Sequence, residues 1–186
     1  MIGFASFRSV ARLTYNCSSM TSERRGNPSA NRKSNPEGST SRILAIDYGR
    51  KRIGLALSDE LGATAQPLAT LQRRNRRNDM LRLREICAKH GVARIVVGHP
   101  LHITGEAGEM AVEAERFAAR LSNELGIETE LLDERLTSWE AKQTMAETKS
   151  RSRRKEGSVD AIAAAVLLRD YLSHLNETRR KPAEKS

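Results

Sequence analysis

Four acidic residues lie beside apolar segments of the sequence. Asp47 follows the apolar run 43–46, Asp133 and Glu134 follow the apolar residues of "IETELLD", and Asp160 opens a long apolar segment. Sites in open α/β sheets form at the carboxyl ends of strands, so a suitable fold would gather these side chains at one edge. Such a group of carboxylates repels itself unless a cation lies within it.

The chemistry that this acidic set predicts is metal-dependent hydrolysis. Oxygen ligands favour hard cations, so we expect Mg²⁺ or Mn²⁺ with Asp47, Asp133, Glu134 and Asp160 as ligands. Two such ions can activate a water molecule and stabilise the leaving oxygen of a phosphodiester. The sequence alone does not decide between Asp133 and Glu134, although Glu134 is favoured.

Each acid also has a plain structural interpretation. Asp47 would accept hydrogen bonds from the backbone of a turn. Asp160 would stabilise the first turn of a helix through its dipole, and Glu134 would pair with Arg135 at the surface. These alternatives stay open for each acid taken alone. The occurrence of three acids at the ends of elements favours the site.

Basic residues gather in three places. One is the turn after Asp47, the second is "RRNRR" at 73–77, and the third is the segment 149–155, which shortly precedes Asp160. Phosphate contact is the functional interpretation, and a solvated loop is the alternative. The residues predicted to contact nucleic acid are Arg50, Lys51, Lys149, Arg151, Arg153, Arg154 and Lys155.

The elements that would position these residues begin with an antiparallel unit. The apolar run 43–47 predicts a buried strand, and alternation over 53–58 predicts a second strand joined to it by a hairpin with Gly49 at its turn. "ATAQPLATL" predicts a third strand, which Pro67 places at the edge of the sheet.

Helices and strands then alternate along the chain. The expected order is a helix ending at Gly91, a strand in "VARIVVG", a helix over 109–125 closed by Gly126, a strand in "IETELLD", a short helix opened by the capping box Thr137–Glu140, and a helix over 159–175. This alternation predicts an α/β fold with parallel strand pairs and right-handed crossovers.

The chain of 186 residues carries a formal charge of +9, which favours polyanionic partners. Residues 1–41 are expected to form a disordered basic leader, 42–175 the folded domain, and 176–186 a charged tail. The first 22 residues resemble a transit peptide, the alternative being an upstream extension with Met20 as the start. No apolar run is long enough to span a membrane, and Cys87 is expected to be a core thiol.

Four blocks of sequence resemble the YqgF (RuvX) family, also described as Holliday-junction-resolvase-like. They are "ILAIDYGRKRIGLALSD", "IVVGHPLHITGEAG", "LLDERLTSWEA" and "KEGSVDAIAAAVLLRDYL". The resemblance implies an RNase H-like fold, a mixed five-stranded sheet with helices on both faces. It also implies metal-dependent trimming of the 5′ end of precursor 16S rRNA in the cytoplasm. The acidic positions of the family fall on Asp47, on the pair Asp133 and Glu134, and on Asp160.

On this hypothesis Asp47 would bridge two divalent ions, and Glu134 and Asp160 would each bind one. The family usually has leucine and asparagine where this chain has His99 and His102, two histidines that we interpret as polar groups of a loop. Those differences concern contacts with the substrate.

Three other functions are considered. A structure-selective DNA junction nuclease would use the same acids. A nucleic-acid-binding factor without catalysis would not need all the carboxylate positions filled. An ATP-binding protein of the actin and hexokinase kind would need a second D-x-G motif, which the chain lacks. The oligomeric state and any contact with a ribosome precursor stay open.

Overall fold

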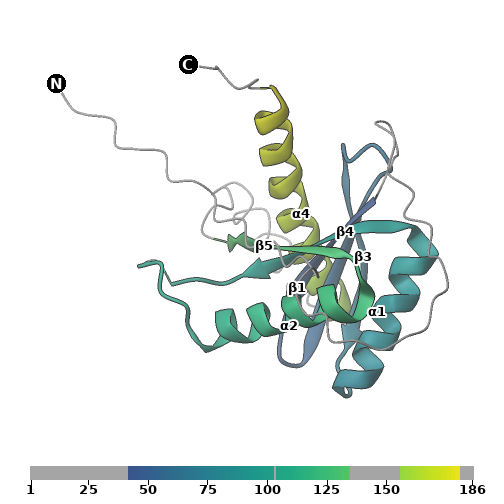
Figure 1. Ribbon diagram of the computed structural model, residues 1–186, viewed down its shortest axis with the longest axis vertical. Helices are drawn as coiled ribbons and strands as arrows, with labels where there is room; N and C mark the ends of the chain where they lie inside the picture. The colour runs from purple at the N-terminus through teal and green to yellow at the C-terminus, as the bar shows by residue number, and fades with distance from the viewer. Residues whose placement is uncertain (1–41, 103, 135–155, 181–186) are drawn as a thin grey trace, which may run out of the picture.

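The computed structural model describes residues 42–102, 104–134 and 156–180 (Figure 1). Its elements are, in chain order, β1 (Arg42–Tyr48), β2 (Arg52–Ser58), β3 (Ala65–Gln72), α1 (Arg76–His90), β4 (Val92–His99), α2 (Glu109–Leu125), β5 (Glu128–Asp133) and α4 (Glu156–Arg180). The predicted capping-box helix, the basic segment 149–155, the leader 1–41 and most of the expected tail lie outside the described residues.

The five strands form one mixed sheet in the order β3-β2-β1-β4-β5. The pairs β1–β2 and β2–β3 are antiparallel, and the pairs β1–β4 and β4–β5 are parallel. The predicted antiparallel start is therefore confirmed, and β3 lies at an edge, as Pro67 indicated. Strand β1 lies at the centre, paired with β2 as far as Tyr48 and with β4 as far as Ile46.

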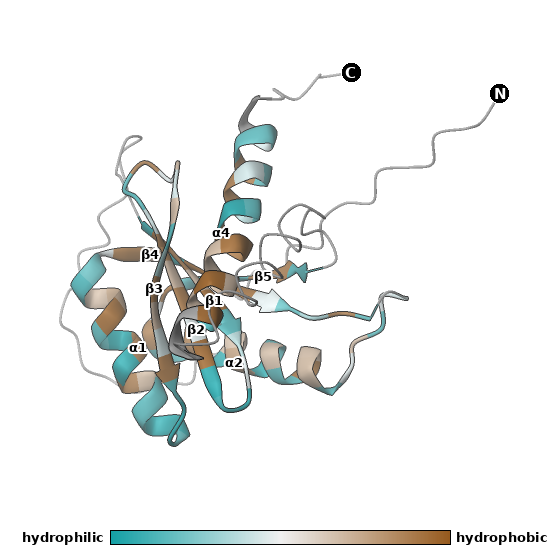
Figure 2. Cartoon of the chain, turned by 180° about the vertical axis from the view of Figure 1, so that it is seen from behind, coloured by the Kyte–Doolittle hydropathy of each residue, from teal (hydrophilic) through white to brown (hydrophobic). Residues whose placement is uncertain are grey.

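Helices cover both faces of this sheet because side chains alternate along each strand. In β1, Leu44 and Ile46 pack into a cluster with α1 and α2, whereas Ile43 and Ala45 pack into a second cluster with α4. Figure 2 shows the apolar strands between helices that turn polar residues outward. The mixed sheet with both faces covered confirms the predicted RNase H-like fold.

The predicted helix ends agree closely with the structure. Helix α1 is capped by Asn75, whose side chain accepts a hydrogen bond from the backbone of Asn78, and it ends at Gly91. Helix α2 ends at Gly126. Both glycines adopt the left-handed conformation, with φ of 64° and 67°, which favours glycine over any other residue.

Helix α4 is longer than expected at both ends, since it spans Glu156–Arg180 and so continues into the expected tail. Cys87 is buried in the core, as predicted. In the part of the chain that the structure describes, no helix is both long and apolar enough to cross a membrane.

Candidate acidic site at the end of the central strand

Asp47 lies between two glycines on the neighbouring strands. It is paired with Gly54 of β2. On its other side, the parallel pairing of Ile46 with Val97 brings Gly98 of β4 next to it. Alternation along β1 places Asp47 on the same face as Ala45, which is the face covered by α4.

Both glycines are places of close approach. A Cβ atom on Gly54 would overlap the backbone carbonyl of Asp160, and a Cβ atom on Gly98 would overlap the Oε1 atom of Glu134. Asp160 therefore lies over the strand on one side of Asp47, and Glu134 lies over the strand on the other side. Because neighbouring strands lie about 4.8 Å apart, Gly54, Asp47 and Gly98 span a stretch of sheet roughly 10 Å wide, over which Asp160 and Glu134 lie.

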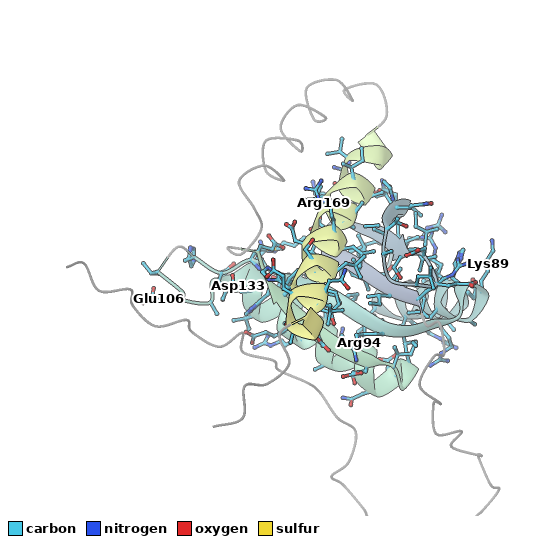
Figure 3. All side chains as sticks on the ribbon, turned by 90° about the horizontal axis from the view of Figure 1, so that it is seen from above. Lys89, Arg94, Glu106, Asp133 and Arg169 are labelled. Carbon is cyan, nitrogen blue, oxygen red and sulfur yellow. The ribbon has the colours of Figure 1, made fainter. Side chains whose placement is uncertain are left out.

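Asp133 and Glu134 are separated by the same alternation. Strand β5 pairs with β4 so that Asp133 is opposite His99. Leu132 packs in the α4 cluster, so the strand directs Asp133 to the other face, and the next residue returns to the α4 side. The backbone thus directs Glu134 to the side of Asp47 and Asp133 to the face of α2. Figure 3 labels Asp133 and Arg94, which lie at opposite ends of the β4–β5 pair.

Asp160 forms an ion pair with a residue that the sequence analysis missed. The Nε atom of Arg52 lies 2.7 Å from the Oδ2 atom of Asp160, and 35% and 22% of the two side chains are exposed. This oxygen is buried and has no hydrogen bond of good geometry. Arg52 begins β2 and shares a face with Gly54 and Ala56; these small residues were the signal that a helix passes closely above them.

The acids do not form a closed set of ligands. Within the described part of the chain, no three His, Cys, Asp or Glu side chains lie close enough together to hold one metal ion. The backbone places three acids around one point of the sheet, and the side chain of one of them is turned to an arginine.

The predicted basic residues at the β1–β2 turn differ in their surroundings. Arg50 donates hydrogen bonds to Glu109 at 3.0 Å and to Glu113 at 2.9 Å, both on α2. Bonds to these two carboxylates raise the pKa of the Arg50 guanidinium. Lys51 is exposed. Lys149, Arg151, Arg153, Arg154 and Lys155 lie outside the described residues.

Arg73, the first residue of "RRNRR", holds this turn in place. Its Nη1 atom donates to the hydroxyl of Tyr48 at 2.9 Å and to the carbonyl of Gly49 at 3.1 Å. Its Nε atom lies 3.3 Å from a carboxylate oxygen of Asp79, which is almost fully buried. Arg73 is therefore part of the scaffold behind Asp47, whereas Arg74, Arg76 and Arg77 are exposed.

The interpretation of His99 as a loop residue was wrong. His99 is the last residue of β4, because its backbone continues the pairing with β5 as far as Asp133. Its ring is buried, and Nε2 lies 2.9 Å from Glu115 of α2. His102 does lie in the loop that follows, as expected, and it is exposed.

The fold and these residues define a class of protein, an RNase H-like domain with acidic residues on the backbone around the carboxyl end of its central strand. The chain matches the family model described as "RuvX: Holliday junction resolvase" over residues 41–174, and it belongs to this family.

Several relatives share most of their length with this chain. A protein of Koribacter versatilis named "Putative pre-16S rRNA nuclease" is 39% identical over 141 residues, which are 76% of this chain and 92% of the relative. A protein of the same name from Opitutus terrae is 46% identical over 132 residues, which are 70% and 90% of the two chains. Among solved structures, the RuvC protein of T. thermophilus bound to a Holliday junction substrate aligns with a TM-score of 0.47 and 15% identity, covering 72% of this chain and 96% of that one.

Proposed function

We propose that this chain is a metal-dependent phosphodiester hydrolase that processes the 5′ end of precursor 16S rRNA during ribosome biogenesis in the cytoplasm. The names of its relatives support this substrate. The observation that carries the proposal is the placement of Asp47, Glu134 and Asp160 around one end of β1 on one face of the sheet.

The groups at this edge are of the chemical kind that a hard divalent cation prefers, since the donors are carboxylate oxygens. The Oδ2 atom of Asp160 is buried and makes no hydrogen bond, and its partner is the guanidinium of Arg52. We propose that Asp47, Glu134 and Asp160 hold Mg²⁺ or Mn²⁺, and that Asp133, on the other face, does not. The cation would stabilise negative charge on the oxygens of the phosphodiester during cleavage.

The chain's own residues would position the substrate. The backbone of Asp47 pairs with β2, and the residue before it pairs with β4, so the strand would hold Asp47 in position when the substrate binds. Lys51 is exposed beside this end of the sheet and can meet a phosphate, as can the basic residues of 149–155. Arg50 would contribute only where the phosphate competes with Glu109 and Glu113.

A second candidate function is cleavage of branched DNA. The description of the matching family model, a Holliday junction resolvase, favours it. Both functions would use the same three acids, so the substrate and not the site distinguishes them. A third candidate function is nucleic-acid binding without catalysis. This function would give no role to Asp47, Glu134 and Asp160.

The test is cleavage of a precursor 16S 5′-leader RNA and of a four-way DNA junction with Mn²⁺ or Mg²⁺. We expect the wild-type protein to cut the RNA, and we expect Asp47→Asn, with its fold verified by circular dichroism, to lose this activity. Cleavage of the junction alone would move the function to DNA. Activity that survives Asp47→Asn would refute the site.

Two neighbouring acids provide a matched comparison. Glu134→Gln and Asp133→Asn each remove one charge from adjacent positions, but the backbone directs them to opposite faces. We expect cleavage to fall by at least a hundredfold in Glu134→Gln, since one missing electrostatic group at a reaction centre costs about that much, and to change little in Asp133→Asn. A larger loss of cleavage in Asp133→Asn than in Glu134→Gln would assign the metal to Asp133.

A further inference from the structure

Arg52 contacts one of the three acids and has no assigned role. It lies at the start of β2, two residues before Gly54, on the face that α4 covers. Its Nε atom lies 2.7 Å from the Oδ2 atom of Asp160. Both side chains are more than half buried, so this pair is less screened by water than an ordinary surface ion pair.

A positive charge is needed at this place even in the protein without metal. Three carboxylates around the end of β1 repel one another unless a cation lies nearby. The guanidinium of Arg52 is a cation that the described structure places against one member of this set, Asp160. Arg52 offsets the negative charge of Asp160, the acid that α4 brings closest to β2.

The same contact blocks an oxygen that a metal ion would use. Direct ligation by Mg²⁺ requires an oxygen at about 2.1 Å, and a guanidinium at hydrogen-bonding distance from that oxygen occupies the same space. The contact lacks good hydrogen-bond geometry, so the interaction is mainly one of charge. A divalent ion carries twice the charge of Arg52 and can replace it.

We propose that Arg52 is a built-in counter-ion that holds Asp160 in the metal-free protein and competes with the divalent cation for this carboxylate. The proposal rests on the proposed function, because it needs a metal at the acidic site. Arg52 is a positioning residue on this view. It keeps the acidic set folded before the metal binds, and it lowers the affinity of the protein for that metal.

The experiment measures the dissociation constant of Mn²⁺ by titration calorimetry for the wild-type protein and Arg52→Gln. We expect Arg52→Gln to bind Mn²⁺ on the order of tenfold more tightly, since it loses a competing ion pair, and tenfold corresponds to about 1.4 kcal/mol. A merely structural role would give the opposite change, because a distorted site binds more weakly. The matched control is Arg42→Gln, which breaks an arginine–carboxylate contact to Glu60 at 3.1 Å elsewhere on the sheet and should leave the affinity unchanged.

Thermal unfolding gives a second readout. Without metal, Arg52→Gln should unfold at a lower temperature than the wild-type protein, because its carboxylates lose their counter-ion. Saturating Mn²⁺ should then stabilise Arg52→Gln more than it stabilises the wild type, by linkage to the tighter binding. If Arg52→Gln does not fold, Arg52→Lys replaces it, with a smaller gain in Mn²⁺ affinity expected from its weaker match to a carboxylate.

The outcomes separate this proposal from the proposed function. Equal or weaker Mn²⁺ binding by the folded variants, beside normal binding by the wild type, overturns the role of Arg52 and leaves the nuclease standing. A wild-type protein that binds no Mn²⁺ overturns both.

Discussion

Gly54 and Gly98 should respond very differently to the same substitution. Positive φ angles occur at other glycines, such as Gly91 and Gly126, so Gly54 and Gly98 are needed for space and not for a special backbone conformation. At Gly54 an added Cβ atom would meet the backbone carbonyl of Asp160. At Gly98 it would meet the ends of two side chains, those of Glu134 and Leu167.

The expected loss of stability depends on which atoms must move to make room for the added Cβ atom. Overpacking a core costs about 1–3 kcal/mol, and Gly54→Ala belongs at the upper end because the start of α4 has to shift as a unit. In Gly98→Ala the side chains can rotate away, and alanine is about 0.5–1 kcal/mol better than glycine inside a strand, so the net loss should be below about 1 kcal/mol. For a domain of this size, 1 kcal/mol corresponds to about 4 °C in Tm.

Thermal and urea unfolding of the two variants would test this difference. We expect Tm to fall by about 10 °C in Gly54→Ala and by less than about 4 °C in Gly98→Ala. Cleavage should nevertheless fall strongly in Gly98→Ala, because the carboxylate of Glu134 is displaced. If Gly54→Ala is as stable as the wild type, α4 does not pass over β2 as closely as described, and the argument that places Asp160 beside Asp47 fails.

Four further predictions concern the scaffold and the substrate. Burial raises the pKa of the Cys87 thiol to about 11, so in the folded protein at pH 8 it should react with a thiol reagent far more slowly than in urea, and equal rates would refute its burial. Because this pKa is higher than that of an exposed thiol, stability should decrease as the pH rises from about 9 to 11, as urea unfolding at several pH values would show. Arg73→Ala should cost about 2–3 kcal/mol, since it leaves the buried carboxylate of Asp79 without its ion pair, and an unchanged urea midpoint would contradict this. Replacing Arg153 and Arg154 by alanine should weaken RNA binding and flatten its salt dependence, and an unchanged slope of affinity against salt would remove both residues from the interface.

Much of the fold could be predicted because its signals are local. Apolar runs and alternation define β1 and β2 within single stretches of sequence, and Gly91 and Gly126 mark helix ends through their own backbone conformation. The order of the strands could not be predicted, because pairing β1 with β4 joins residues about 50 positions apart. His99 shows the same limit: it was expected in a loop, and pairing with β5 makes it the end of a strand.

For the candidate site, the sequence indicates residue types but not their arrangement. Asp47, Glu134 and Asp160 were selected because each stands where an apolar segment begins or ends. The choice between Asp133 and Glu134 needed the face on which α4 packs, which no single strand reveals. Arg52 was missed because it reads as one more residue of a basic turn. Only its alternation with Gly54 and Ala56 sets it apart from Arg50 and Lys51.

Asp47, Glu134 and Asp160 are held in place by different elements. Their positions therefore differ in how sensitive they are to a shift of one strand or helix. Asp47 lies in a central strand with hydrogen-bonded neighbours on both sides. Glu134 directly follows β5, which pairs with β4 alone within the described sheet, and Asp160 depends on the packing of α4 against β2. A shift of one strand or helix therefore moves Glu134 or Asp160 while Asp47 stays. A cation shared by all three would join these elements, so metal binding should stabilise the packing of α4 and β5 more than that of the central hairpin.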